Sequence, residues 1–415
     1  MKPVRALLGL ALAAALALPT HAAPAAKSRW IGGWTAGLMS DPKGALPEGA
    51  EDVTLRQVVR VTAGGGRIRL RLTNAFGTTP LVVDSVRVGL AGERATAQVL
   101  AGSDKPVTFS GRAQVIVPAG ASYLSDPIAL PVKPLTRLAV SFHLPKRPSE
   151  STLHWVANTT GWLAKGDRTA NADLADAQKI DHWHNLAGVE VEADARASVV
   201  LAFGDSITDG HGATPNLDDR WTDVLAQRLQ ADPRARHIAV LNTGISGNRL
   251  LSSGSNPGGL SRLDRDVFSQ PGVKTIILLL GINDIGALSR EPGPITPEKR
   301  QAVVEGLAAG YTQVIERAHA KGIKVIGATL LPFAGNKYYR SDAEADADRQ
   351  AVNRWIRTSG AFDAVIDFDQ ITRDPARPLN MRSEYDSGDL LHPGPAGYRA
   401  MGEAIPLDLL LKFSK

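Results

Sequence analysis

Residues 199–210 read VVLAFGDSITDG. The first five are an apolar run of strand length, and glycines lie on both sides of the serine that follows. Such a serine lies where a buried strand ends, so that its hydroxyl can be exposed at the edge of a sheet. Serine becomes an effective nucleophile only when a base takes its proton. The same residues are also typical of a strand-to-helix turn in which Asp205 or Ser206 caps a helix, and the stretch alone leaves both interpretations open.

From about residue 196, apolar strand-like runs alternate with helical patterns. The strand-like runs are 199–203, 237–241, 273–280, 323–331 and 364–368, and the helical patterns are 220–230, 260–268, 297–321, 341–358 and 397–413. This alternation predicts an α/β domain with a parallel five-stranded sheet and helices on both faces. Ligands bind at the carboxyl ends of the strands in such sheets, which is where Ser206 lies.

The preceding region has a different period. In residues 51–147 apolar and polar residues alternate, which is typical of strands with one buried face. The stretch 54–76 predicts a hairpin around Gly64–Gly66, and further strand-like runs follow at 81–90, 113–117 and 137–144. Several short strands without a helical period indicate a β-sandwich of jelly-roll type. Residues 165–194 are polar and irregular, and we interpret them as the connection. We therefore predict a β-sandwich accessory domain over 27–194 and a catalytic domain over 196–415.

The N-terminus has the pattern of an export signal. Lys2 and Arg5 precede an apolar run over 6–18, and small residues before Ala23 suit a cut after Ala22. We therefore predict a signal peptide over 1–22 and a secreted or periplasmic protein without stable membrane insertion. No other stretch is long and apolar enough to span a membrane.

Composition excludes several classes of protein. The 415 residues contain no cysteine, which excludes disulfides and zinc–thiolate sites. An apolar share of 43% is enough for a sizeable core. The formal charge of +5 falls to about +3 without Lys2 and Arg5, and the arginines are not concentrated, so nucleic acid is not an expected partner. Oligomeric state is left open.

Three further polar clusters follow predicted strands or precede the last helix. They read NTGISGN at 242–248, GIND at 281–284 and DLLHP at 389–393. Backbone N–H groups and an Asn side chain are suitable donors to an oxyanion, and an acid three residues before a histidine can orient it as a base. Taken singly, each cluster is also typical of an ordinary turn.

Together and in this order, the four clusters resemble those of the SGNH, or GDSL-type, hydrolase superfamily. Gly204-Asp205-Ser206 is similar to its nucleophile block, with Ile207 where leucine is common. Gly247 matches the glycine block, Asn283 the asparagine block, and Asp389 with His392 the Asp-x-x-His block. The resemblance covers about residues 196–415, and the β-rich region ahead of it looks like that of several bacterial two-domain esterases.

The resemblance implies a role for each of these residues. Ser206 would attack the ester carbonyl, His392 would take its proton, and Asp389 would orient His392. The backbone N–H groups of Ser206 and Gly247 and the side chain of Asn283 would form the oxyanion hole. No cofactor and no metal are implied.

Other polar groups have simpler interpretations. His182 and His184 form a poor metal pair without a third ligand. Asp218 and Asp219 precede a helical pattern and are interpreted as capping and first-turn charges. Trp221 is assigned to the core. Five of the seven tryptophans lie before residue 196, where packing is favoured over stacking on sugars.

Three functions remain. The favoured one is a serine esterase that removes short acyl groups, most plausibly O-acetyl groups from carbohydrate. The second is a lysophospholipase or general arylesterase with the same residues. The third, of another class, is a glycan-binding protein with an inactive hydrolase domain, which the complete set of five residues argues against.

Overall fold

The computed structural model describes residues 28–41, 46, 50–148, 150–254 and 256–415. The predicted signal peptide, residues 1–22, lies outside the described residues. Within them, no helix combines the length and the apolar character needed to cross a membrane.

A parallel five-stranded sheet forms the C-terminal part, as predicted. Its strands are β16 (Ser198–Gly204), β17 (Ile238–Asn242), β18 (Val273–Leu279), β19 (Lys324–Ala328) and β20 (Ala364–Ile366). Their order is β17-β16-β18-β19-β20. The order therefore reverses at β16, which is the point where doubly wound sheets bind ligands. All seven residues of β16 are buried, and β17 and β18 pair with its two edges.

The helices of this part include one or more in each predicted pattern and several short ones outside the patterns. They are α1 (Ser206–Asp209), α2 (Trp221–Ala231), α3 (Gly259–Leu263), η1 (Asp264–Phe268), α4 (Ile282–Ala287), η2 (Leu288–Arg290), α5 (Pro297–His319), α6 (Ala343–Thr358), α7 (Phe368–Thr372), α8 (Pro395–Ala404) and α9 (Leu407–Phe413). The last pattern, 397–413, was predicted as one helix and is two. Pro406 lies between them, and a proline lacks the N–H that a continuous helix would need.

Antiparallel sheets make up the N-terminal part, which confirms a β-sandwich. One sheet contains β1 (Ser28–Thr35), β15 (Leu186–Asp194), β4 (Ile68–Thr73) and β9 (Ser122–Leu124) in that order. The other contains β13 (Gln178–Ile180), β12 (Gly161–Lys165), β3 (Val53–Arg60), β10 (Arg137–Leu144), β6 (Ser85–Leu90) and β7 (Lys105–Pro106). Smaller sheets join β14 (Trp183–His184), β11 (Thr152–His154) and β2 (Met39–Ser40), and β5 (Leu81–Val83) with β8 (Val115–Val117).

The predicted hairpin over 54–76 is wrong. Strand β3 pairs with β10 and β12, whereas β4 pairs with β15 and β9, so the two strands lie in different sheets. The three glycines carry the chain across, and a Cβ on Gly65 would lie only 2.1 Å from the carbonyl oxygen of Glu192. The expected solvated face of β3 is also absent, since Arg56 is buried and donates to backbone carbonyls of Ala97 and Asn171.

The region 165–194 is not an irregular connection. It contains β13, β14 and the nine-residue strand β15, which lies between β1 and β4 in the first sheet. Its polar residues are compatible with a strand because they are paired: the carboxylate of Glu190 forms ion pairs with Arg69 and Arg71 of β4. The chain passes from the β-sandwich to β16 within residues 195–197.

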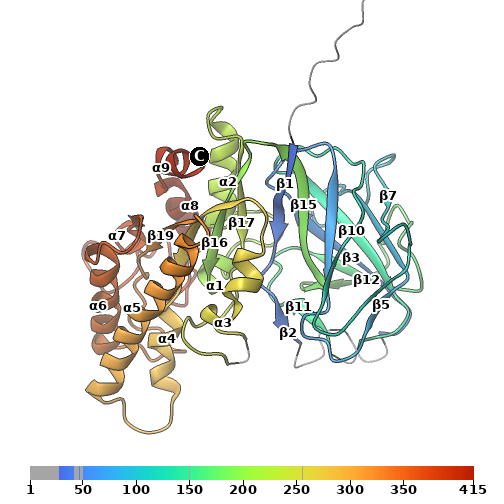
Figure 1. Ribbon diagram of the computed structural model, residues 1–415. Coiled ribbons are helices and arrows are strands. Elements are labelled where there is room, and N and C mark those ends of the chain that lie inside the picture. Colours follow the sequence, from blue (N-terminus) through green and yellow to red (C-terminus); the bar gives the residue numbers. More distant parts are fainter. Residues whose placement is uncertain (1–27, 42–45, 47–49, 149, 255) are drawn as a thin grey trace, which may run out of the picture.

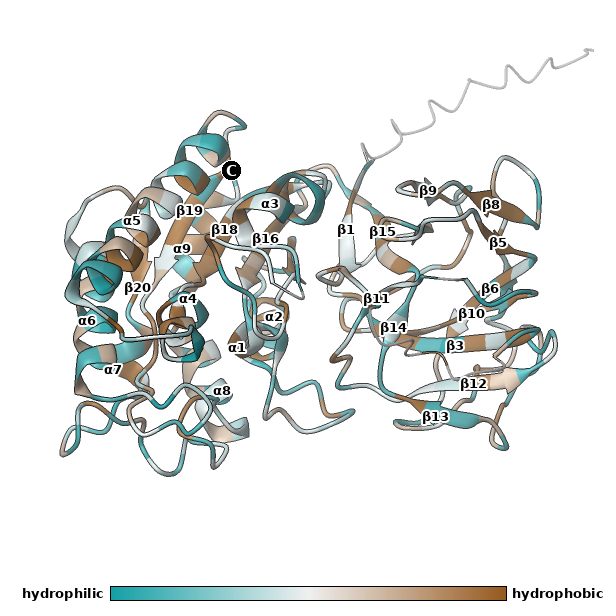
Figure 2. Ribbon diagram, turned by 90° about the horizontal axis from the view of Figure 1, so that it is seen from below, coloured by the Kyte–Doolittle hydropathy of each residue, from teal (hydrophilic) through white to brown (hydrophobic). Residues whose placement is uncertain are grey.

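The two parts lie side by side, with the edge strand β1 of the first antiparallel sheet beside the edge strand β17 of the parallel sheet (Figure 1). Hydropathic colouring shows the apolar strands inside each part and α1 and α3 toward the boundary (Figure 2). Thr62 of the β-sandwich accepts from the N–H of Val240 and donates to its carbonyl oxygen, at 3.0 and 2.7 Å. The carboxylate of Asp218 pairs with Arg137 and Arg60 across the same boundary. Hydrogen bonds and ion pairs therefore connect the two parts across this boundary.

Candidate active site

The nucleophile block forms a tight turn between β16 and α1. Asp205 caps α1 by accepting the N–H of Ile207 at 3.0 Å, and Ser206 is the first residue of the helix. Gly204 has to be a glycine, because a Cβ there would lie 2.1 Å from the hydroxyl oxygen of Thr208. The capping role that the sequence left open therefore falls to Asp205, and the hydroxyl of Ser206 is available for another partner.

That partner is His392. The Ser206 hydroxyl oxygen lies 2.8 Å from Nε2 of His392, and Nδ1 of the same ring lies 2.6 Å from Oδ2 of Asp389. The structure thus brings Ser206 and His392 together across 186 residues of chain. A base that is hydrogen-bonded to a hydroxyl and oriented by a carboxylate is the arrangement that activates a serine.

The loop that carries Asp389 and His392 folds around the carboxylate. Oδ1 of Asp389 accepts the N–H groups of Leu391 and His392 at 2.9 and 2.8 Å. Partial burial raises the pKa of Asp389, but the hydrogen bonds from the His392 ring and from these N–H groups outweigh it and hold that pKa well below its ordinary value. The tight loop places Leu390 at φ +62°, a conformation uncommon for a leucine.

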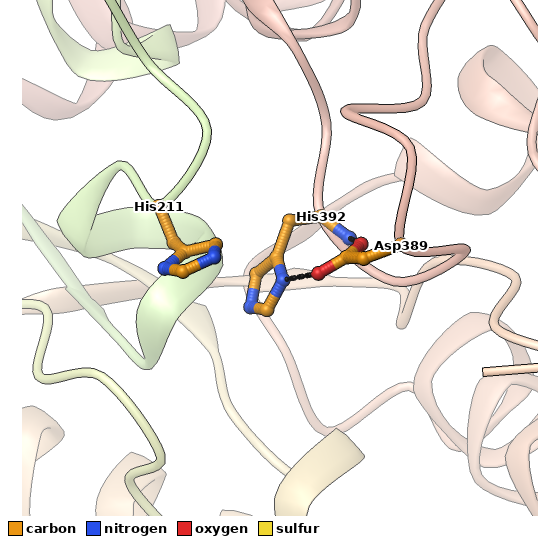
Figure 3. Close-up of side chains that lie close together, drawn as sticks. All are labelled: His211, Asp389 and His392. Carbon is orange, nitrogen blue, oxygen red and sulfur yellow. Dashed lines mark hydrogen bonds and ion pairs between the residues drawn. The ribbon is translucent and has the colours of Figure 1, made fainter. Parts of the chain in front are cut away.

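His211 also lies at this site, and the sequence analysis missed it. Its ring centre is 4.1 Å from that of His392, on the side away from the Asp389 hydrogen bond (Figure 3). Burial, with a smaller contribution from His392, lowers the pKa of His211. Within the described ranges, His211, Asp389 and His392 each offer one possible metal ligand within 4.8 Å of the others. A metal bound through Nδ1 of His392 would have to replace the proton shared with Asp389.

The predicted oxyanion donors come from the two neighbouring strands. Gly247 lies in the loop after β17 at φ +74°, and Asn283 is the second residue of α4, directly after β18. The Asn283 side chain is buried and donates to the carbonyl oxygen of Asn248 at 2.9 Å. A primary amide has two N–H groups, and the bond to Asn248 uses one of them.

Tyr339 fixes the orientation of this amide, and the sequence analysis did not identify it. Its hydroxyl donates to Oδ1 of Asn283 at 2.5 Å. Because Oδ1 accepts that bond, the amide nitrogen has to face the opposite side. Tyr339 comes from the segment before α6, and its own N–H donates to the side chain of Asn336, whose Nδ2 in turn donates to the carbonyl oxygen of Asp389. Nothing in the spacing of the four blocks points to this segment.

Arg262 is a third group that the sequence analysis missed. It is fully buried in α3 below the nucleophile turn. Its guanidinium donates to the carbonyl oxygens of Gly204 and Thr243 at 2.9 and 2.7 Å and to Oδ1 of Asn248 at 2.9 Å. The ends of β16 and β17 are therefore held together by one side chain, which Asp266 neutralises.

Two buried carboxyl groups lie under the same turn. Burial raises the pKa of Asp205 to about 7, and the hydrogen bond from Ile207 opposes this only in part. Burial likewise raises the pKa of Asp284 to about 6, although it accepts the N–H groups of Leu250 and Leu251. Asp284 therefore anchors the loop after Gly247 and has no contact that suggests proton transfer.

The Asp205 shift predicts a pH-dependent stability. A group whose pKa is raised in the folded state stabilises the fold below its unfolded pKa, and this contribution is lost as pH rises through about 7. Asp205→Asn mimics the neutral form. As the pH rises from 6 to 8, the wild type should lose stability while the variant does not. The free energy of unfolding of the variant, measured by urea denaturation, should therefore increase by about 1 kcal/mol relative to that of the wild type. A difference that stays constant over this range would show that Asp205 is ionised throughout.

The remaining candidates have structural roles. His182 stacks on Trp155, with ring centres 4.4 Å apart. His184 is buried, and its ring centre lies 6.1 Å from that of His182. Trp221 is in the core, as predicted. Asp218 and Asp219 were expected to cap α2, and this is wrong. Asp218 pairs with arginines of the β-sandwich, Asp219 accepts the N–H of Thr214, and Arg220 occupies the capping position.

None of the seven tryptophans is an exposed side chain. Trp34, Trp162, Trp183 and Trp221 are buried, and Trp30, Trp155 and Trp355 are half-buried. The tryptophans of the β-sandwich therefore pack rather than present flat faces to solvent.

Comparisons with known proteins place this site in a family. Residues 202–400 match the model of the GDSL-like lipase/acylhydrolase family. No curated protein matches the sequence. Similar solved structures include an aryl esterase from M. smegmatis, with 20% identity over 52% of this chain and 100% of that chain and a TM-score of 0.39. Another is a carbohydrate acetylesterase from Sinorhizobium meliloti, with 17% identity over 52% of this chain and 100% of that chain and a TM-score of 0.38.

A GDSL-like lipase from Bacteroides thetaiotaomicron has 19% identity over 52% of this chain and 88% of that chain, with a TM-score of 0.37. The matched residues contain Ser206, Gly247, Asn283, Asp389 and His392. Through residues 202–400 the chain belongs to the GDSL-like lipase/acylhydrolase family and is a carboxylic ester hydrolase.

Proposed function

We propose that this chain hydrolyses short-chain carboxylic esters, most plausibly O-acetyl groups on carbohydrate, with Ser206, His392 and Asp389 as its catalytic triad. The observation that carries the proposal is the continuous hydrogen-bonded series from the Ser206 hydroxyl through the His392 ring to the Asp389 carboxylate, at 2.8 and 2.6 Å. An inactive glycan-binding protein would have no need of this arrangement.

The proposed reaction has two stages. His392 takes the proton of Ser206 as the hydroxyl oxygen attacks the ester carbonyl, and then gives that proton to the leaving alcohol. Water next attacks the acyl-serine by the same route in reverse. In each stage the N–H groups of Ser206 and Gly247 and the side chain of Asn283 would donate to the oxyanion. The low pKa of Asp389 keeps it ionised, so that it can stabilise the charge that His392 gains when it takes the Ser206 proton.

The proposed preference for a short acyl group rests on confinement. Ser206 is 5% exposed and Asn283 3% exposed, so the reacting carbonyl has to approach two largely covered side chains. Gly247, in contrast, is exposed, and a Cβ added there would meet nothing within 4 Å. A small acyl group such as acetyl reaches the two covered side chains more easily than a bulky one does.

We also propose the organisation and location of the protein. Residues 27–194 would form a β-sandwich domain that supports the catalytic domain over 196–415. The hydrogen bonds of Thr62 and the ion pairs of Asp218 support a fixed partner rather than a tether. Residues 1–22 would direct export to the periplasm or the medium, where acetylated polysaccharides are accessible.

A series of p-nitrophenyl esters tests the substrate class. We expect kcat/KM to fall steadily from acetate through butyrate to octanoate, because the proposed substrate carries a short acyl group. Acetate release from acetylated polysaccharides should follow, and EDTA should not change either rate. Faster turnover of octanoate than of acetate would favour the lysophospholipase or arylesterase alternative, and a loss on EDTA that zinc restores would contradict the metal-free mechanism.

A further inference from the structure

A buried histidine of the β-sandwich reaches the catalytic part. His154, the last residue of β11, is 3% exposed. Its Nδ1 lies 2.7 Å from the carbonyl oxygen of Gly37, and its Nε2 lies 2.9 Å from Oδ1 of Asp209 and 3.0 Å from the carbonyl oxygen of Val156. Because all of these partners are acceptors, both ring nitrogens have to carry a proton. His154 is therefore an imidazolium that forms a buried ion pair with Asp209.

The charge of Asp209 makes this state possible. Burial alone would lower the pKa of His154, but the Asp209 carboxylate and the bond to Gly37 raise it above its ordinary value, against a smaller opposing effect of Arg220. The Arg220 guanidinium donates instead to the backbone carbonyl oxygens of Asp209 and Ala157. The pair is thus fixed from both parts of the molecule.

Asp209 connects His154 to the predicted oxyanion loop. It is the last residue of α1, three positions after Ser206. While Oδ1 accepts from His154, Oδ2 accepts both the N–H and the hydroxyl of Ser246, at 3.0 and 2.8 Å. Ser246 directly precedes Gly247, so its backbone position sets the direction of the Gly247 N–H. One carboxylate therefore links the nucleophile helix, the oxyanion loop and the β-sandwich.

Other residues of the β-sandwich pack against the same loop, at residues 244–246. Ile245 packs with Met39 and Leu153 in a small apolar cluster. Gly37 approaches so closely that a Cβ there would lie 2.5 Å from the Ile245 side chain and 2.8 Å from the carbonyl oxygen of Gly244. The loop is consequently held by the second domain along residues 244–246 and not only by its own strand.

We propose that His154 is a positioning residue for ester hydrolysis: through Asp209 and Ser246, the β-sandwich holds the Gly247 N–H in the oxyanion hole. This rests on the proposed function and adds a role for the N-terminal domain in turnover itself. His154 touches neither the substrate nor Ser206, and it acts through the carboxylate alone.

His154→Asn tests the proposal, because the shorter amide can still donate to Gly37 but cannot reach Asp209. We expect kcat for p-nitrophenyl acetate to fall on the order of 10-fold, part of the loss that removal of a whole oxyanion donor causes, with KM little changed. His154→Gln, which keeps a donor near the position of Nε2, should recover much of kcat. Ser246→Ala should lower kcat too, and its effect should not add to that of His154→Asn.

His143→Asn is the matched control. His143 is also a buried histidine of the β-sandwich, and its Nε2 contacts Asp52 at 3.0 Å within that part. It should lower the melting temperature without lowering kcat. If His154→Asn and His143→Asn reduce kcat equally, or if Ser246→Ala retains the wild-type kcat, the proposal is wrong. The Ser246 variant decides the matter if His154→Asn does not fold.

Failure of the proposed function would look different. If the Ser206→Ala variant remained active, the proposed triad itself would be wrong. An inactive Ser206→Ala variant beside a His154→Asn variant with wild-type kcat would overturn the positioning role alone.

Discussion

Ser206→Ala is expected to reduce kcat for p-nitrophenyl acetate by roughly 10⁴-fold or more, since the proposed acyl intermediate forms on the Ser206 hydroxyl. The variant should remain folded. Ser206 is small, and alanine at this position loses only its hydrogen bond to His392, which costs about 1 kcal/mol. Steady-state kinetics and thermal unfolding of the same preparation measure both effects.

Ser198→Ala provides the control for this change. Ser198 is also buried and begins the same strand, β16, at the end opposite to Ser206. It should leave kcat unchanged. Undiminished turnover by pure Ser206→Ala enzyme would end the triad hypothesis.

Asn283→Ala is expected to lower kcat by a factor of roughly 10² to 10³ with a much smaller change in KM. The reason is that the amide donates more strongly to an oxyanion than to a ground-state carbonyl. Because the side chain is 3% exposed and bonded to Asn248 and Tyr339, some loss of stability should accompany the kinetic effect. A change confined to KM would instead make Asn283 a ground-state binding residue.

Tyr339→Phe tests the same donor without touching it. The variant removes the hydroxyl that fixes Oδ1 of Asn283, so the amide can rotate and kcat should fall by less than in Asn283→Ala. Tyr338→Phe is the matched control, because Tyr338 is the adjacent tyrosine and is 60% exposed. Equal effects of the two tyrosine variants would show that Tyr339 does not orient the amide.

The parallel sheet was predictable because each of its strands contains a run of apolar residues and lies between helical patterns. The β-sandwich was predictable only as a class. Alternation in 54–62 and 67–72 indicates strands but does not say with which strand each one pairs, and β3 and β4 take their partners from residues 137–144 and 186–191. Polar content misled the analysis at β15, where Glu190 is neutralised by arginines of the neighbouring strand.

The candidate site likewise contains residues that the sequence indicated and residues that only the structure reveals. Ser206, Gly247, Asn283, Asp389 and His392 stand in short blocks, and the resemblance of these blocks to a known family pointed to them. Tyr339, Arg262 and His154 act through contacts between segments that are far apart in the chain, and His154 is 55 residues from Asp209. No local pattern distinguishes such a residue from an ordinary buried polar side chain. Their roles become visible only when donors and acceptors are followed across the fold.

Covalent labelling tests the central claim most directly. The protein is incubated with a serine-directed phosphonate ester, and the site of modification is found by mass spectrometry of its peptides while residual esterase activity is followed. We predict one phosphonate for each chain, on Ser206, with activity lost in proportion to labelling. Full activity in protein that is completely labelled at Ser206, or loss of activity with the label on another residue, would contradict the assignment of Ser206 as the nucleophile.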